Sequence, residues 1–217
     1  MPDLSGAEPP LMPYAPRIDL TGYTVLLVTQ RFEAGEFLGF ETRNRYRIFD
    51  RDGLLVGYAA EPRDGAVGFL ARQFLGHWRS FDLQFFNVLR RPAMLAHHPF
   101  RFYFTRLDLY DATGGRIGGI ERRFGLLSKR LVIEDAGGRV VMEVCSPIWR
   151  LWTFPFMAGG RQRAKVSKRW SGGFSELVTD RDDFLVEFTD PRLTNAERLL
   201  VLTAAIYIDL TWFERKR

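Results

Sequence analysis

The feature that most constrains the fold is an apolar segment near the C-terminus, residues 199–213. It follows Thr194-Asn195-Ala196-Glu197, the pattern of a capping box, in which the first and last side chains bind each other's backbone N–H groups at a helix start. The next ten residues of helix, 199–208, carry no charged side chain. A helix that is apolar on nearly every face must be enclosed either by protein or by a membrane.

Two observations favour enclosure by protein. The uncharged run is ten residues long, whereas a membrane-spanning helix needs about 18 or more. Asp209 would also lie in hydrocarbon, at a cost of at least about 2.5 kcal/mol. We therefore predict a central buried helix over about 195–213, with Asp209 hydrogen-bonded or near the mouth of the surrounding structure. The alternative is a helix that spans a membrane.

The middle of the chain predicts the strands that would surround this helix. Asp-Gly or Gly-Gly pairs at 52–53, 114–115, 137–138 and 159–160 each separate two β-rich runs, which is typical of β-hairpins. The expected strands are 45–49, 54–59, 106–110, 116–122, 130–134, 139–144, 152–156 and 161–170. No long helical pattern interrupts them, so the sheet should be antiparallel, and closure would remove its edges. We predict a mainly β fold, a closed antiparallel barrel around the C-terminal helix.

The domain organisation is simple. Residues 1–20 contain five prolines and predict a flexible leader, and residues 21–217 form the barrel domain. The start lacks a basic-then-apolar secretion signal, and neither end carries a myristoylation or prenylation pattern. Cys145 is the only cysteine, so no internal disulfide is possible. Its place in the apolar run 140–145 predicts a buried, inert thiol.

Five blocks of sequence then point to a known family. They are FETRNRYRI at 40–48, YAAE at 58–61, VSKRWSG at 166–172, TDRDDF at 179–184 and IDLTWFE at 208–214. In these blocks, which occur in family order, the chain resembles the phospholipid scramblases, relatives of the tubby-like C-terminal fold and of the plant LURP-one-related proteins. The resemblance implies a tubby-like barrel of twelve antiparallel strands around a central hydrophobic helix.

The resemblance also implies a calcium segment, which in the family begins Asp-x-Asp-x-Phe and ends in acidic residues after a second Phe and a Pro. Asp180, Asp182, Phe184 and Phe188 match this pattern, and Asp183 and Glu187 add carboxylates. Thr189 replaces the Pro, and Pro191 and Leu193 replace later acidic positions. The candidate ligands for Ca²⁺, the one cofactor considered, are Asp180, Asp182, Asp183 and Glu187. The alternative is a strand-to-loop transition with solvated acids.

Two predicted strands place basic residues on one face, because side chains alternate along a strand. The candidate lipid head-group ligands are Arg43, Arg45, Arg47, Arg161, Arg163, Lys165 and Arg169. Tyr46 and Ile48, or Ala164, Val166 and Trp170, should point the other way. Arginine forks match phosphate oxygens, and the formal net charge of +5 suits an acidic surface. The alternative is the ordinary charged exterior of a barrel.

Other function classes find little support. The three histidines and the single cysteine show no nucleophile or metal pattern, and the glycine pairs lack P-loop or dinucleotide spacing. No covalent catalysis is therefore expected. Nucleic acid is a disfavoured partner, since no helix-turn-helix or zinc-finger spacing occurs. The aromatic cluster Trp149, Trp152, Phe154 and Phe156 suits either a membrane interface or, as we favour, the filling of the barrel.

The leading hypothesis is a phospholipid scramblase-like protein that binds anionic phospholipid at a membrane surface and promotes calcium-dependent transbilayer phospholipid movement. The alternative is an intracellular tubby-like module that binds lipid or protein without transport. The expected partner is an anionic membrane surface, with protein as a second option, and the expected location is the cytoplasm, peripheral at the inner membrane.

Overall fold

The structure is a computed structural model of the chain that describes residues 16–31, 36–37, 40–62, 81–98, 106–150, 152–169 and 183–213. Within these ranges only the backbone is described for residues 31, 36–37, 40–43, 62, 81, 169 and 213.

Thirteen β-strands and a C-terminal helix lie within the described residues. The strands are β1 Val25–Arg31, β2 Glu36–Phe37, β3 Phe40–Asp50, β4 Leu55–Pro62, β5 Phe81–Asn87, β6 Pro92–His98, β7 Arg106–Asp111, β8 Arg116–Arg123, β9 Ser128–Asp135, β10 Val140–Pro147, β11 Thr153–Ala158, β12 Arg161–Arg169 and β13 Asp183–Phe188. Helix α2 covers Asn195–Ile208 and continues as a π-helical turn over Asp209–Phe213.

Twelve of these strands close into an antiparallel barrel, as predicted. Strands β3 to β13 pair each with the next along the chain, and β1 inserts between β3 and β13. The two-residue strand β2 pairs only with β3, outside the ring. All strand pairs are antiparallel, because hairpin connections link most neighbours. Closure leaves no long edge open to aggregation.

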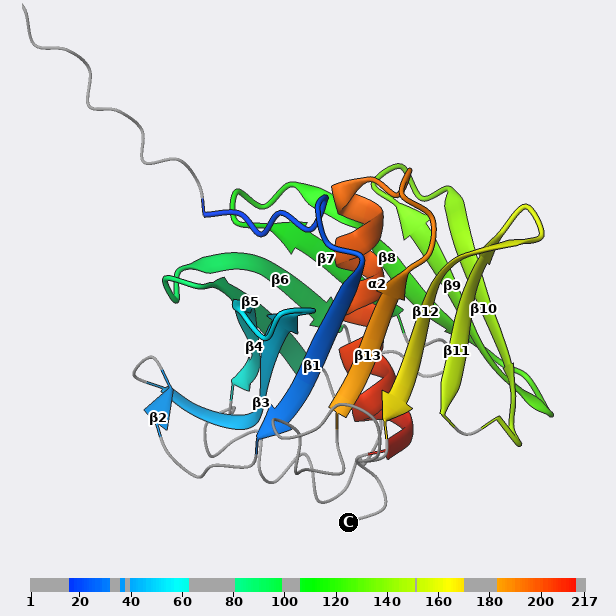
Figure 1. Cartoon of the computed structure of the whole chain (residues 1–217), viewed down its shortest axis with the longest axis horizontal. Helices are drawn as coiled ribbons and strands as arrows, with labels where there is room; N and C mark the ends of the chain where they lie inside the picture. The colour runs from blue at the N-terminus through cyan, green and yellow to red at the C-terminus, as the bar shows by residue number, and fades with distance from the viewer. Residues whose placement is uncertain are drawn as a thin grey trace, which may run out of the picture.

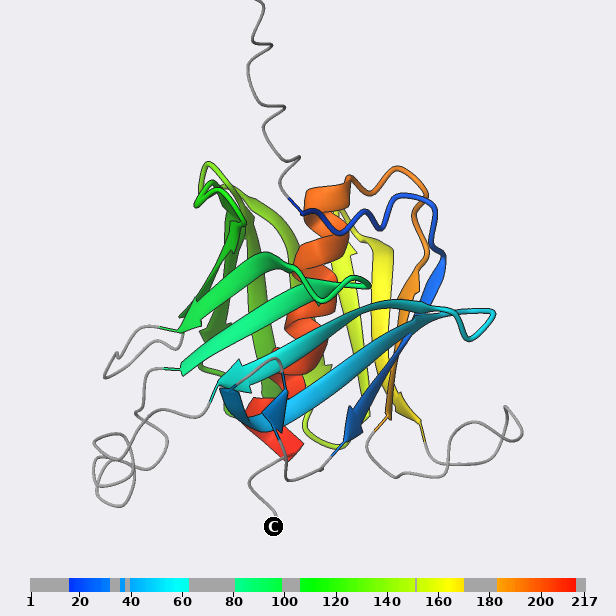
Figure 2. The ribbon, with the colours of Figure 1, turned by 90° about the vertical axis from the view of Figure 1, so that its left-hand side faces the viewer.

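Helix α2 runs through the middle of the barrel, as Figures 1 and 2 show. The predicted capping box is present: the Glu197 N–H donates to Thr194 Oγ1 at 3.2 Å, and the Thr194 N–H donates to Glu197 Oε2 at 2.8 Å. Every residue from Arg198 to Ile208 is buried. The uniformly apolar sequence of the helix thus faces strands on all sides, which confirms enclosure by protein. Within the described residues, no helix is long and apolar enough to cross a membrane.

Gly118 of strand β8 faces the helix. A Cβ atom there would lie 2.3 Å from the backbone oxygen of Glu134 and 2.9 Å from Leu200 Cδ1. Gly118 therefore allows α2 to lie against the sheet. Its neighbour Gly119 faces outward, where a Cβ atom would lie 2.9 Å from the Arg106 guanidinium.

Two predictions about single segments are wrong. Cys145 is exposed, because Met142 and Val144 point into the core and strand alternation turns Cys145 outward. Ile18 and Leu20, assigned to the flexible leader, are buried in the core, and the Leu20 N–H donates to Asn195 Oδ1 at 2.7 Å. The packed domain therefore begins before residue 21. Residues 1–15 of the predicted leader lie outside the described residues.

The barrel has two ends, which we call the cap end and the tail end. The cap end contains Thr194 at the helix start and the turns at residues 51–54, 88–91, 112–115, 136–139 and 159–160. The tail end contains the π-helical turn 209–213, the β8–β9 turn at residues 124–127 and the β10–β11 turn around residues 148–150. Antiparallel strands alternate in direction, so the connections fall alternately at the two ends (Figure 1).

Candidate functional site

The predicted basic faces of β3 and β12 do point outward where their side chains are described. Tyr46 and Ile48 of β3 are buried in the core, as are Ala164 and Val166 of β12. The intervening side chains therefore lie on the exterior: Arg45 and Arg47 on β3, and Arg161, Arg163 and Lys165 on β12. For Arg43 and Arg169 the structure describes the backbone alone.

Two cations of β12 are held by carboxylates of this chain. The Arg163 guanidinium contacts Glu197 Oε1 at 2.7 Å and Asp190 Oδ2 at 3.1 Å, and Lys165 Nζ lies 2.6 Å from Glu187 Oε2. Hydrogen bonds from Arg192, and then from Arg163, keep the pKa of Asp190 well below its ordinary value. These pairs join β12 to β13 and to the helix start. Arg161 differs from these two cations. Its side chain is exposed and makes no ion pair with any residue that the structure describes.

The other basic strand lies near an acidic candidate. The register places Arg47 of β3, Thr29 of β1, Asp183 of β13 and Arg169 of β12 in one row across four strands. Asp183 is only 2% exposed. Sequence reasoning assigned these positions to separate lipid and calcium sites, whereas the closed barrel brings them together. A carboxylate between arginine positions is well placed to act as their counter-ion.

The predicted calcium ligands are only partly visible. Asp180 and Asp182 lie outside the described residues, Asp183 occupies the row just described, and Glu187 pairs with Lys165. Among the described residues no three His, Cys, Asp or Glu side chains group as a metal site would require. Calcium binding by these residues stays a prediction.

The interior of the tail end is polar. Tyr46 Oη donates to Asp209 Oδ2 at 3.0 Å, and the Asn44 side-chain amide donates to Glu61 Oε2 at 2.8 Å. Gln30 Nε2 donates to Asn44 Oδ1 at 3.1 Å. All five residues are buried. The expectation that Asp209 is hydrogen-bonded is confirmed, and the network ties the end of the helix to strands β1, β3 and β4.

Cations and aromatic rings also meet at the tail end, and some of them contact Trp212 in the last turn of the helix. The Trp212 ring stacks on Phe154 with centroids 5.8 Å apart. Arg122 Cζ lies 5.5 Å and Lys129 Nζ 5.8 Å from the Trp212 centroid, both within cation–π range. Lys168 Nζ lies 5.3 Å from the Phe184 centroid.

Sequence reasoning missed these three cations, although a signal was present. Arg122 is two residues from buried Ile120, Lys129 two from Leu131, and Lys168 two from Val166. Each therefore continues the inward face of its strand to the rim of the barrel. The predicted aromatic cluster divides between the core and the surface. Phe154 and Phe156 fill the core, while Trp149 is 71% exposed.

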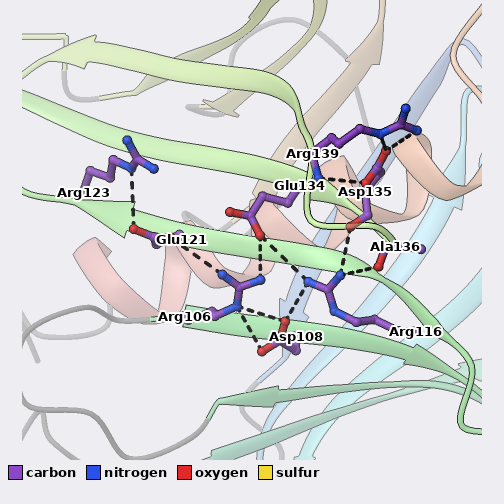
Figure 3. Close-up of polar contacts among 9 residues, drawn as sticks. All are labelled: Arg106, Asp108, Arg116, Glu121, Arg123, Glu134, Asp135, Ala136 and Arg139. Carbon is purple, nitrogen blue, oxygen red and sulfur yellow. Dashed lines mark hydrogen bonds and ion pairs between the residues drawn. The ribbon is translucent and has the colours of Figure 1, made fainter.

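A second group of arginines, on the outer faces of β7 and β8, is paired with carboxylates of this chain, including Glu134 of β9 (Figure 3). The Arg106 guanidinium contacts Glu134 at 2.6 Å and Asp108 at 3.0 Å, and Arg116 contacts Asp108 at 3.1 Å. Burial alone would lower the pKa of Arg106, but the hydrogen bonds to Glu134 and Asp108 outweigh it and raise that pKa. Carboxylates already occupy these guanidinium groups, so this cluster fits a structural role.

Comparison with known proteins identifies the family. The family model described as Scramblase matches residues 9–215, nearly the whole chain. The chain belongs to the scramblase family. This scramblase-family chain is 30% identical to phospholipid scramblase 1 of Mus musculus over 95% of its own length, and 28% identical to phospholipid scramblase 1 of Rattus norvegicus over 96%. It is 24% identical to a phospholipid scramblase family protein of Schizosaccharomyces pombe over 97%.

The scramblase-family chain covers 65%, 66% and 64% of the lengths of these three relatives, slightly less than two thirds of each. No solved structure matches it significantly.

Proposed function

We propose that this protein is a phospholipid scramblase-like protein that binds anionic phospholipid at a membrane surface and promotes phospholipid movement between leaflets. The observation that carries the proposal is the match of nearly the whole chain to the Scramblase family model and to relatives named phospholipid scramblase. The net charge of +5 agrees with an acidic surface as partner. A cytoplasmic protein, peripheral at the inner membrane, fits this partner.

The proposed interaction is non-covalent. Each Lys or Arg close to an anionic bilayer contributes about 1 kcal/mol, and guanidinium groups bind phosphate oxygens through two parallel hydrogen bonds. Arg45, Arg47 and Arg161 are predicted head-group ligands whose described side chains lie on the outer faces of β3 and β12. Because helix α2 occupies the barrel axis, we place the head groups on the exterior and rim of the barrel.

Reconstituted vesicles test this proposal directly. The full chain should float with phosphatidylcholine vesicles that contain 30% phosphatidylserine, and it should float less with pure phosphatidylcholine or at high salt. In vesicles with fluorescent lipid in both leaflets, transport lets dithionite quench more than the outer half. Binding without extra quenching, with and without calcium, would reject transport and leave binding. Absence of flotation on both compositions would reject the whole proposal.

Calcium dependence is a separate part of the proposal, with Asp180, Asp182, Asp183 and Glu187 as ligands. The pairing of Glu187 with Lys165 at 2.6 Å means that a calcium ion would compete with an ammonium group. We expect millimolar calcium to raise the melting temperature of the wild type, and the D180N/D182N variant to lose that increase. Magnesium serves as the control ion. An equal increase in both proteins would exclude Asp180 and Asp182 as ligands.

The second candidate is a tubby-like module that binds lipid or protein without transport. The enclosed helix favours it, since a filled barrel offers no route for lipid along its axis. The R45Q/R47Q/R161Q variant tests whether the outer faces of β3 and β12 bind the head groups. It should weaken vesicle binding if the strand faces hold the head groups, while R51Q/R90Q/R91Q, which removes the same number of charges from exposed cap-end turns, is the control for folding and net charge.

A further inference from the structure

The two described turns at the tail end expose a concentration of large apolar side chains. The β8–β9 turn presents Phe124 at 85%, Leu126 at 81% and Leu127 at 60% exposure, and the β10–β11 turn presents Ile148 at 44% and Trp149 at 71%. Isolated exposed apolar residues are ordinary, but five on two neighbouring turns are not.

The two turns form one surface. The Ile148 backbone N–H donates to the Leu127 carbonyl oxygen at 3.1 Å, which links the turns directly. In Figure 1 both turns project from the side of the barrel where the helix ends. We refer to residues 124–127 and 148–149 as the tip pair.

The charge around the tip pair has one sign. Residues 122–130 and 146–153 contain the cations Arg122, Arg123, Lys129, Arg130 and Arg150 and no Asp or Glu. These five charges equal the formal net charge of the whole chain, so the cations and carboxylates elsewhere balance. Arg123 pairs with Glu121 at 3.5 Å, whereas Arg122, Arg130 and Arg150 make no ion pair with any described residue.

This arrangement has the composition of a membrane-inserting surface. Trp and Phe at an interface place apolar rings among acyl chains, while cations beside them meet lipid phosphates. A protein partner of ordinary composition would need matching carboxylates opposite the cations that remain unpaired here. An anionic bilayer provides a phosphate layer with an apolar layer beneath it. The apolar side chains of the tip pair would reach the apolar layer, and the cations beside them would remain at the phosphates.

We infer that the tip pair is the membrane-docking element of this protein and that it inserts into anionic bilayers with the tail end facing the lipid. This inference rests on the proposed function and specifies which surface performs its first step. Insertion at these turns would bring the Arg122, Lys129 and Trp212 cluster to the level of the head groups, directly behind the tips. The last helical turn would then lie near the membrane, while the cap end would face water.

Substitution at the tips is the first test. In F124S/L126S/W149S we expect at least about tenfold weaker partitioning onto vesicles with 30% phosphatidylserine, because three apolar side chains leave the bilayer. The matched control, L54S/V88S/L89S, removes three exposed apolar side chains at the cap end and should bind like the wild type. Circular dichroism melting checks that both variants fold.

A fluorescent label gives a second test that does not depend on loss of binding. Cys145 is the only cysteine and is exposed on the outer face of β10, so C145S provides a background for single labels. An environment-sensitive dye on L126C should shift to the blue when vesicles are added, and the same dye on L89C should not. Equal shifts at both positions would overturn the proposed orientation.

The outcomes separate this inference from the function on which it rests. Wild-type binding that the tip substitutions leave unchanged would overturn the inference and retain the proposed function. No wild-type binding to either lipid composition would overturn both. A wild-type dimer in light scattering that becomes a monomer in the tip variant, without vesicle binding, would instead assign the surface to a second copy of this chain.

Discussion

The two ends of the barrel reverse the chain in chemically different ways. At the cap end, four turns repeat one arrangement around an initial Asp or Asn: Asp50, Asn87, Asp111 and Asp135. In each, the fourth residue donates its N–H to the carbonyl of the first, and the first side chain accepts backbone N–H groups within the turn. Such turns satisfy their own polar groups and need nothing from outside.

The two described tail-end turns, β8–β9 and β10–β11, contain no comparable carboxylate. Residues 122–130 and 146–153 lack acidic side chains altogether, and their apolar groups face outward. Because polar turns of the cap-end kind already connect strands in the same barrel, chain reversal does not require the apolar and cationic residues of the tips. The difference supports the inference that the residues of the tip pair serve contact with something outside the barrel.

The largest predicted effect concerns the tail-end interior. Y46F removes the hydroxyl that donates to buried Asp209, and we expect a loss of about 2 kcal/mol in unfolding free energy, measured by urea denaturation. Y110F is the control, since half-buried Tyr110 makes no side-chain hydrogen bond with a described residue. A loss below about 0.5 kcal/mol would show that Asp209 is held mainly by other partners.

The next prediction contrasts the turns themselves. D111A removes the acceptor of the Thr113 and Gly115 N–H groups, at 2.8 and 2.9 Å, and should cost about 1 kcal/mol. F124S should change the unfolding free energy by less than about 0.5 kcal/mol, since its ring is exposed. Should F124S prove the more destabilising, the tips would belong to the fold, and the contrast between the ends would fail.

Arg90 is the exception within the cap-end series. It has φ of 58° at the position where the other three turns place Gly53, Gly114 and Gly138, all with positive φ. R90G should therefore be more stable than R90A by about 1 kcal/mol, because a Cβ is strained in this conformation. At Arg51, whose φ is not positive, the order should reverse, and thermal melting of the four variants compares them.

The smallest expected effect is a pH dependence confined to the cap end. The Thr113 hydroxyl, followed by backbone N–H groups, lowers the pKa of Asp111 in the folded chain. Ionised Asp111 therefore adds to the free energy of unfolding above the unfolded pKa of about 3.9. This contribution is lost as the pH falls below that value toward the lower pKa of the folded chain. The melting temperature of the wild type should fall toward that of D111N below about pH 4. Asn87 shows that an amide can serve in the same turn. A difference in melting temperature between wild type and D111N that does not change with pH would contradict the lowered pKa of Asp111.

The sequence predicted the architecture well, for identifiable reasons. The Gly-containing turns located four hairpins, and the capping box with its apolar run located α2. Alternation correctly assigned the outer faces of β3 and β12. It would also have shown Cys145 to be exposed, had it been applied to β10 in place of overall hydrophobicity.

The candidate site was much less predictable. The pairing of Arg163 with Glu197 and the row that joins Arg47 to Asp183 depend on strand register and closure, which no local pattern specifies. The tip pair depends on two turns being neighbours, although Phe124 and Trp149 are 25 positions apart in the sequence.

The position of β1 has a consequence for how the chain reaches its native state. The first strand of the ring is held between β3 and β13, so its second partner is complete only when residue 188 is available. Until then the barrel is an open sheet, and the central helix, which follows β13, has no enclosure. During synthesis the N-terminal strand must wait for nearly the whole chain, and such late, sequence-distant closure is slow to form. A ribosome that stalled before β13 would leave both an unpaired edge and an uncovered apolar interior for chaperones to shield.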